Sequence, residues 1–214
     1  MQSNFSEVER RVKRYWYTDG LWELIGGGMF ILLGLYFSLQ QYFGDQSPMG
    51  VILQSSLILF LIAAIFLGRR LINALKGRLT YPRTGYVEYQ TVEKNSFWRR
   101  ILTMTIAMTI AMFMVVISRR VDALDSTAAL TGALVAVILL VKQGWSSGMP
   151  RFYLLSAVSL ILGVALSVSG LPSGYNLAVY YGLMGIAFAI SGGLTLRHYL
   201  HENPLPADAE PRNG

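Results

Sequence analysis

The chain of 214 residues contains no cysteine and only two histidines. The absence of cysteine excludes a disulfide framework, a thiolate nucleophile, and any zinc or iron–sulfur site that depends on cysteine ligands. Charged residues are also scarce, at 14% of the sequence against 53% hydrophobic residues, and the mean hydropathy is +0.45. This balance excludes an ordinary soluble fold and places the chain among membrane proteins.

Six apolar stretches approach the length that crosses a bilayer, because about 18 residues at 1.5 Å per residue span most of a hydrocarbon core of roughly 30 Å. The fourth has the shortest fully apolar part, so five spans is the one serious alternative. The first is too long for a signal peptide and lacks a cleavage site, so we expect it to remain as an anchor. The predicted fold class is all-α, a polytopic membrane protein with six transmembrane helices at residues 21–43, 51–68, 101–118, 126–141, 152–169 and 177–196.

Basic residues predict the orientation of these spans. With the N-terminus inside, only Arg119 and Arg120 of the 18 Lys and Arg residues fall outside, which leaves sixteen on the cytoplasmic side. The net charge of +6 then divides into +7 inside and −1 outside, which favours attraction to anionic lipid over nucleic-acid binding. We expect a multi-pass protein of the cytoplasmic (inner) membrane with both termini cytoplasmic. The tryptophans agree, since all fall at the cytoplasmic interface that indoles prefer: Trp16, Trp22, Trp98 and Trp145.

The segments outside the spans divide the chain further. Apolar residues at helical spacing within residues 1–20, with a capping box of Ser6 and Glu9, predict a short interfacial amphipathic helix. A plain basic topogenic segment is the alternative. Asp19 is well placed to cap the first span. Beyond it we expect a two-helix hairpin, a basic cytoplasmic loop, four further helices and a disordered cytoplasmic tail, at residues 21–68, 69–100, 101–201 and 202–214.

The loop at residues 69–100 holds the best local candidate site. The helical period continues for a few residues past the second span, and Gly77 is a reasonable stop. Arginines interleaved with aromatic residues at headgroup level suit bidentate contact with phosphate. The alternative is the positive-inside rule acting alone. The candidate lipid- or phosphate-binding residues are Arg69, Arg70, Lys76, Arg78, Tyr81, Arg83, Tyr86, Arg99 and Arg100.

Within this loop, residues 80–87 read Thr-Tyr-Pro-Arg-Thr-Gly-Tyr-Val. The stretch resembles one in a group of uncharacterised prokaryotic multi-spanning membrane proteins that carry a similar basic sequence in a cytoplasmic loop. The resemblance is confined to this stretch and implies no activity.

Small residues at every fourth position mark faces where helices approach closely in lipid. The last three predicted spans carry such stripes, so we expect these spans to pack together, with an oligomer contact as the alternative. Spans one and two have less regular equivalents in Gly27 with Gly34 and Ala64 with Gly68. The stripes are Ala128, Gly132 and Ala136; Ser159, Gly163 and Ser167; and Gly185, Ala189 and Gly193.

The sequence provides few groups for catalysis or metal binding. No ionisable residue lies deep in a predicted span, which argues against a proton-coupled pump with an acidic relay. Glu23, one turn inside the first span, is expected to snorkel to the interface or favour the helix N-terminus. Proton or cation handling is its alternative role. His198 and His201 lack a third metal ligand nearby, so a solvated helix end is the favoured interpretation.

Sequence motifs for enzymatic function are likewise missing. Nucleophile elbows, phosphate-cradling loops and dinucleotide fingerprints do not occur, and residues 26–28, three glycines, lie inside an apolar span. A methionine ladder in the third span favours packing over Cu(I) conduction: Met104, Met108 and Met112. We therefore expect no catalytic residue, no cofactor and no metal site.

Two classes of function remain. The first expectation is transport or permeation of a small solute or ion, as a homo-oligomer or as the membrane subunit of a larger transporter, because compact polytopic proteins without catalytic groups commonly do this. Its path would be lined by Gln54, Ser56, Thr105, Thr109, Ser156 and Ser159.

The alternative is a non-enzymatic membrane interaction or scaffold protein whose basic loop binds anionic lipid or a partner protein. Transport requires the path residues to face a hydrated cavity, whereas a scaffold buries them in helix contacts. A third hypothesis, a lipid-modifying enzyme, requires convergence of Asp19, Glu23, His198 and His201.

Overall fold

The computed structural model describes residues 14–44, 46–84 and 128–204, and every regular element in these ranges is helical. An all-α fold is therefore confirmed for the described residues. The elements are α2 (Leu21–Phe43), α3 (Pro48–Leu75), the π-helix η1 (Lys76–Thr80), α4 (Tyr81–Thr84), α6 (Ala128–Ser147), α7 (Arg151–Ser167) and α8 (Ser173–Glu202).

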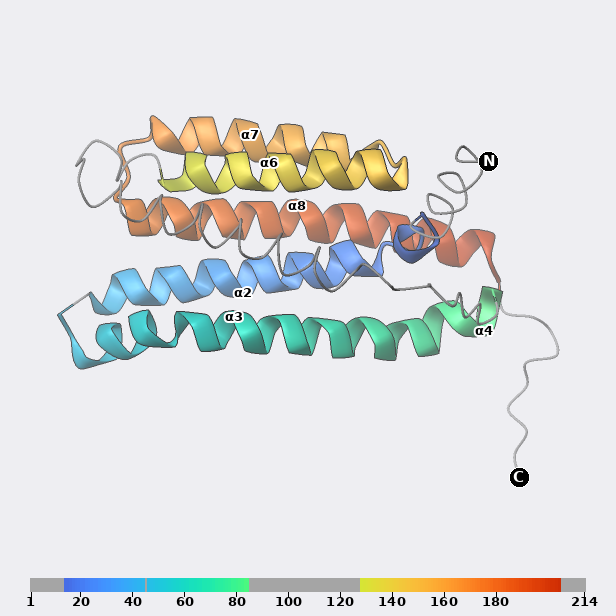
Figure 1. The fold of residues 1–214 in the computed structure, drawn as a ribbon, viewed down its shortest axis with the longest axis horizontal. Coiled ribbons are helices and arrows are strands. Elements are labelled where there is room, and N and C mark those ends of the chain that lie inside the picture. Colours follow the sequence, from blue (N-terminus) through green and yellow to red (C-terminus); the bar gives the residue numbers. More distant parts are fainter. Residues whose placement is uncertain (1–13, 45, 85–127, 205–214) are drawn as a thin grey trace, which may run out of the picture.

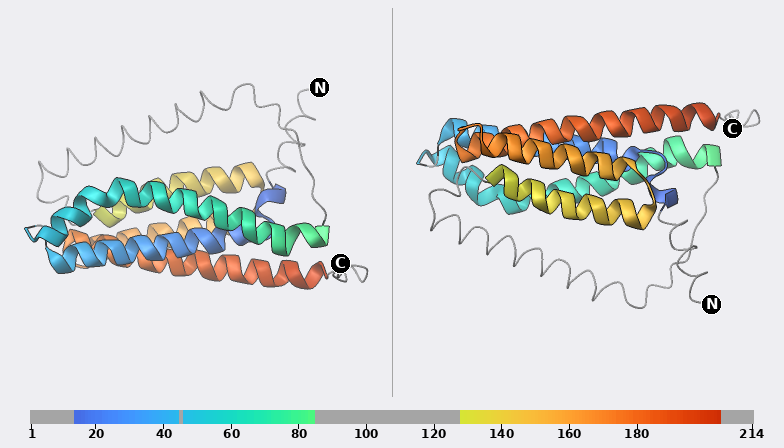
Figure 2. Two further views of the ribbon diagram at one scale, coloured as in Figure 1. Left: turned by 90° about the horizontal axis from the view of Figure 1, so that it is seen from below. Right: turned by 90° about the horizontal axis from the view of Figure 1, so that it is seen from above.

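The long helices run alongside one another (Figure 1). Helix α8 lies between α2 and the α6–α7 pair, while α3 packs on the other side of α2. Figure 2 shows α4 and the end of α8 at one end of the bundle and the start of α6 at the opposite end. We call the end that holds α4 the basic end, because the arginines described below gather there.

Four described helices are long and apolar enough to cross a membrane: Leu21–Phe43, Pro48–Arg83, Ala128–Ser147 and Gly174–Glu202. Helix α7 is apolar but shorter, at 17 residues. These helices are compatible with an integral membrane protein, as expected from the composition. The predicted first span coincides with α2, and the second, fourth, fifth and sixth each overlap one helix. The predicted third span, residues 101–118, lies outside the described residues, as do residues 1–13 of the predicted interfacial helix.

Helix α3 begins with a capped turn and continues further than expected. Ser47 accepts a hydrogen bond from Gly50 N at 2.9 Å, and Pro48 occupies the first helical turn, where it needs no amide donor. The predicted stop at Gly77 is wrong, because the helix continues through η1 and α4 to Thr84. Buried contacts of Lys76 and Thr80, described below, hold this extension along the bundle and override the weak helix propensity of glycine.

Glycines determine how α2 packs on α8. A Cβ on Gly27 would lie 2.7 Å from both Gly185 O and Ala189 N, and one on Gly34 would lie 2.8 Å from Gly182 N. Only glycine allows two helix backbones to approach this closely. The small residues of α8 therefore face α2, which differs from the expectation that they face the two preceding spans.

Helix α6 packs mainly against α7, as the sequence suggested, but through a face shifted by one residue. Ala129 and Ala133 are fully buried, whereas Ala128, Gly132 and Ala136 of the predicted stripe are only half-buried. The facing residue on α7 is Gly163, whose added Cβ would lie 3.3 Å from Leu130 Cα.

The remaining members of the stripes are placed less tightly. Gly132 faces Tyr180 of α8, and a Cβ added to it would lie 3.6 Å from the Tyr180 ring. Ser167 donates a hydrogen bond to Val164 O in its own helix. A Cβ on Gly193 would meet nothing within 4 Å. Small-residue periodicity thus located contact faces approximately, and it indicated α7 as the partner of α6 but not α2 as the main partner of α8.

Candidate lipid-binding site at the basic end

A tight turn leads the chain into α2 at the basic end. Gly20 has φ +70°, a left-handed conformation that glycine adopts without strain, and an added Cβ would lie 2.6 Å from Gly192 O. Asp19 Oδ1 accepts a hydrogen bond from Leu21 N, the first amide of α2, at 3.2 Å, although the N-cap position itself is Gly20 rather than Asp19. The turn brings Asp19 against the extension of α3.

Asp19 forms a buried ion pair with Lys76. The carboxylate Oδ2 lies 3.2 Å from Nζ, and the two side chains are only 1% and 2% exposed. Thr80 donates a further hydrogen bond to Asp19 Oδ2 at 3.1 Å, while Lys76 Nζ donates to Trp16 O at 2.9 Å and lies over the Trp16 ring. Lys76 was a predicted phosphate-binding residue, but its ammonium group is used inside the protein.

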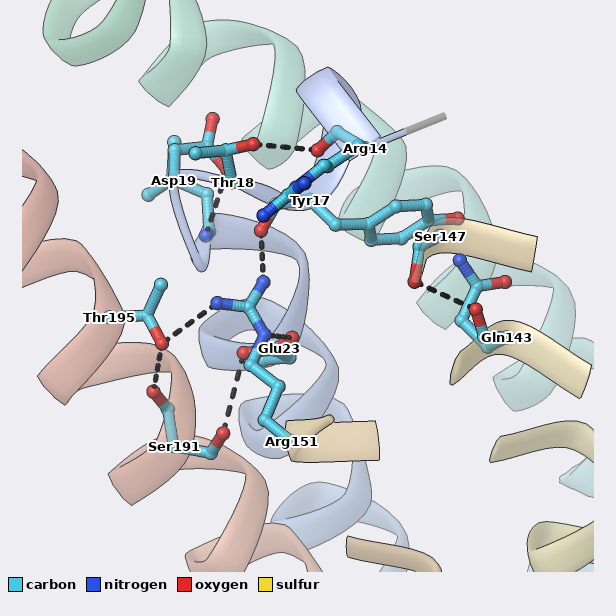
Figure 3. Close-up of polar contacts among 11 residues, drawn as sticks. Arg14, Tyr17, Thr18, Asp19, Glu23, Gln143, Ser147, Arg151, Ser191 and Thr195 are labelled. Atoms are coloured by element: carbon cyan, nitrogen blue, oxygen red, sulfur yellow. Dashed lines mark hydrogen bonds and ion pairs between the residues drawn. The ribbon is translucent and has the colours of Figure 1, made fainter. Parts of the chain in front are cut away.

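Glu23 forms a second ion pair, with Arg151 at the start of α7 (Figure 3). Glu23 Oε1 lies 2.8 Å from Arg151 Nε, and the Glu23 side chain is fully buried. The guanidinium also donates to Tyr17 O and, at 3.0 Å, to Thr195 Oγ1 of α8, while Ser191 Oγ lies 3.5 Å from Glu23 Oε2. Glu23 therefore does not snorkel to the interface as expected, because Arg151 supplies its partner in the interior.

Tyr17 connects this ion pair to the surrounding aromatic residues. Its ring packs edge-on against Trp22 and Phe152, with centroids 5.6 and 5.8 Å away. Burial raises the pKa of the Tyr17 hydroxyl above its ordinary value, and a hydrogen bond with Gln143 of α6 offsets part of that effect. The phenol therefore stays neutral at physiological pH.

Arg83 ties the end of the α3 extension to the end of α8. Its Nη1 donates to Leu200 O at 3.2 Å and to Asn203 O at 2.9 Å. These carbonyls belong to the last turn of α8, where acceptors lack partners within the helix. Arg83, like Lys76, is thus engaged within the protein rather than presented to a phosphate group.

Other arginines of the predicted site remain at the surface. Arg69, Arg70 and Arg78 are exposed, and none makes a hydrogen bond or ion pair with its side chain within the part of the chain that the structure describes. Tyr81 is half-buried. Tyr86, Arg99 and Arg100, the other predicted members, lie outside the described residues.

Two adjoining apolar cavities lie beside Arg69. One, of about 390 Å³, runs between α2 and α3, and the described residues that line it are all apolar or aromatic except Arg69. The other, of about 350 Å³, lies at the basic end and adds Trp16, Tyr17 and Asn73. Because both are lined by Trp22, Arg69 and Ile72, we treat them as one groove, the α2–α3 groove.

The described members of the predicted permeation path line neither of these two cavities. Gln54 is exposed on α3, and Ser56 Oγ lies 3.1 Å from the hydroxyl of Tyr36. Ser156 donates to Tyr153 O in its own helix, and buried Ser159 bonds Ala133 O and the Tyr180 hydroxyl at 2.8 Å. Thr105 and Thr109 lie outside the described residues.

The groups that a lipid-modifying enzyme would require do not converge. His198 is exposed and pairs with Glu202, 3.1 Å away, in the next turn, and His201 is exposed as well. Asp19 and Glu23 face Lys76 and Arg151 instead. Within residues 14–44, 46–84 and 128–204, no three histidines or carboxylates gather as a metal site.

Comparison of the chain with protein-family models, with curated proteins and with solved structures finds no match.

Proposed function

We propose that this chain is a non-enzymatic membrane interaction protein that binds anionic lipid at its basic end. The observation that carries the proposal is the division of the basic residues there. Lys76, Arg83 and Arg151 are engaged inside the protein, whereas Arg69, Arg70 and Arg78 of α3 and η1 are exposed.

The aromatic residues support this assignment. Trp16, Trp22 and Trp145 are 47%, 41% and 71% exposed, and they lie at or near the basic end. Exposed indoles and arginines in one layer are the composition of a membrane interface, where tryptophan anchors and basic residues attract anionic headgroups.

Transport was the first functional expectation, and the described residues favour it less. Ser56, Ser156 and Ser159 satisfy hydrogen bonds within or between helices, as expected of a scaffold. The α2–α3 groove is apolar, so it does not offer the row of polar groups that a permeating ion or hydrated solute requires.

Chain connectivity supports the six-span arrangement within this proposal. Arg83 contacts the end of α8, so Thr84 lies at the basic end. Ala128 begins α6 at the opposite end (Figures 1 and 2). Residues 84 and 128, which flank the predicted span at residues 101–118, therefore lie at opposite ends of the bundle, as one additional crossing would require.

The lipid proposal is tested with Arg70→Gln combined with Arg78→Gln. We expect the double variant to retain less anionic phospholipid through detergent purification than the unmodified protein, because each exposed arginine near a charged leaflet contributes about 1 kcal/mol. Extraction followed by lipid mass spectrometry measures this. Arg83 is left unchanged because it holds α8.

The matched control is Arg197→Gln, which removes an exposed charge from α8 rather than from the α3 extension. Equal lipid retention by the double variant and the unmodified protein would contradict the proposal. Equal loss of anionic lipid by Arg197→Gln would show that the effect comes from surface charge in general and not from the α3 extension.

The orientation is tested with reporters. We expect an activity reporter fused after Gly214 to be cytoplasmic and one inserted at Gln46 to be external, because the first arrangement keeps sixteen of the 18 basic residues inside. The reverse pattern would place the basic end outside and overturn the orientation. Fusion to alkaline phosphatase and to a fluorescent protein distinguishes the two sides.

A further inference from the structure

The α2–α3 groove has the polarity of a lipid molecule. Along the membrane-spanning part it is lined by residues such as Ile25, Phe30 and Phe60, and Arg69 is the only charged residue among the described ones that line it. At the basic end the lining changes to Trp16, Tyr17 and the amide of Asn73. Its volume lies in the range of about 300–1,000 Å³ that is usual for small-molecule sites.

The length of the groove matches one leaflet. On α2 its lining runs from Trp22 to Leu33, a rise of about 16 Å at 1.5 Å per residue, and on α3 from Phe60 to Ile72, about 18 Å. Half of a hydrocarbon core is about 15 Å. The groove therefore begins at headgroup level and ends near the middle of the membrane, where an acyl chain of that leaflet ends.

We propose that this groove is a specific site for one anionic phospholipid, with an acyl chain between α2 and α3 and the phosphate at Arg69. The proposal rests on the proposed function and assigns it a location. Arg69 has the charge that such a headgroup needs, and its side chain makes no ion pair with any described residue. The guanidinium suits bidentate contact with phosphate.

A phospholipid fits the groove better than a transmembrane helix does. A helix that crosses the membrane would need a groove along the whole bundle, whereas this one stops at Leu33 and Phe60, about midway along α2 and α3. A packed helix would also place apolar side chains against Arg69 and leave its charge without a partner, which is costly in lipid.

Adjacent glycines of α2 provide a matched test of the site. A Cβ added at Gly26 would meet nothing within 4 Å, and Gly26 lines the groove, so we expect Gly26→Leu to fill the groove without displacing the backbone. Gly28 also meets nothing within 4 Å and does not line the groove. Gly28→Leu therefore controls for the change in residue type, and Arg197→Gln controls for Arg69→Gln.

The experiment is native mass spectrometry of the full-length protein with palmitoyl-oleoyl phosphatidylglycerol. Phosphatidylcholine with the same chains and glycerol phosphate without chains are the comparison ligands. We expect one phosphatidylglycerol to bind at least about tenfold more tightly than phosphatidylcholine (about 1.4 kcal/mol). Gly26→Leu and Arg69→Gln should each weaken that binding roughly tenfold. Gly28→Leu and Arg197→Gln should not, and glycerol phosphate should not compete.

Several results would overturn the site. Equal binding by the Gly26→Leu and Gly28→Leu variants would show that the lipid does not occupy the groove. Unchanged lipid binding with a lower melting temperature in Gly26→Leu alone would assign the groove to another part of this chain or to a second copy. Competition by glycerol phosphate would show that the site binds a free phosphate compound and not a phospholipid.

The two proposals fail in different ways. If only Arg70→Gln with Arg78→Gln lowers lipid retention, the protein binds anionic lipid but not in this groove. If no arginine variant changes retention, lipid binding itself is refuted. A lower lipid affinity of Gly26→Leu supports the site only if this variant has the same melting temperature as Gly28→Leu.

Discussion

Arg151→Met is expected to destabilise the protein by about 3–5 kcal/mol, because it leaves the Glu23 carboxylate buried without a cation. The guanidinium also joins three segments, since its contacts reach Glu23 in α2, Tyr17 before α2, and Thr195 in α8. Unfolding of the purified protein by denaturing detergent, followed by circular dichroism, measures the loss. Lys142→Met is the control, because Lys142 is exposed on α6.

The double variant Glu23→Met with Arg151→Met separates the ion pair from simple loss of packing. Replacing both partners of a buried pair by apolar residues of similar volume is often neutral or stabilising. We therefore expect most of the stability lost in Arg151→Met to return when Glu23 is also replaced. If the two losses simply add, the two groups do not interact in the folded protein, and the geometry of this ion pair is wrong.

The sequence contained part of the information for this ion pair. Glu23 and Arg151 each stand at the start of a predicted span, and the orientation places both starts on the cytoplasmic side. The residues lie far apart in the sequence, however, and no sequence pattern indicates that α7 approaches α2 near Tyr17. Arg151 was therefore counted only as a topogenic charge, and Glu23 was expected to snorkel to the interface or favour the helix N-terminus without a partner from another helix.

The same limit applies to the basic segment. Composition predicted the gathering of arginines beside aromatic residues, but not which of them would be used internally. Lys76 is buried because the turn at Gly20 brings Asp19 to it, and Arg83 is engaged because α8 ends beside α4. Such contacts depend on how the helices are arranged, which no periodicity in a single sequence encodes.

Helix bounds were predicted more accurately than helix partners, for a physical reason. The apolar length and the flanking turn residues are local, so α2 was placed correctly from Leu21 to Phe43. A stripe of small residues shows that some backbone approaches closely, but any other helix can supply it. The stripe of α8 consequently located a contact face while its partner, α2, was missed.

Gly27→Leu tests that partner, and it is expected to abolish the native packing of α2 on α8. Overpacking of a core commonly costs about 1–3 kcal/mol, occasionally more. Here the added Cβ would lie 2.7 Å from Gly185 O and Ala189 N, which are backbone atoms that cannot rotate away. The helices must separate, so we expect a loss above about 3 kcal/mol or no monodisperse protein.

Gly28→Leu is the control for this variant as well, because a Cβ added there would meet nothing within 4 Å. We expect it to cost no stability, because the added Cβ meets no other atom within 4 Å and glycine is the weaker helix former. Size-exclusion chromatography and detergent unfolding measure both variants. A stable, monodisperse Gly27→Leu protein would show that α2 and α8 do not meet at this glycine. The comparison is informative because the three consecutive glycines have different surroundings. Gly26 lines the groove, Gly27 contacts the α8 backbone, and Gly28 has no neighbour at its Cβ position.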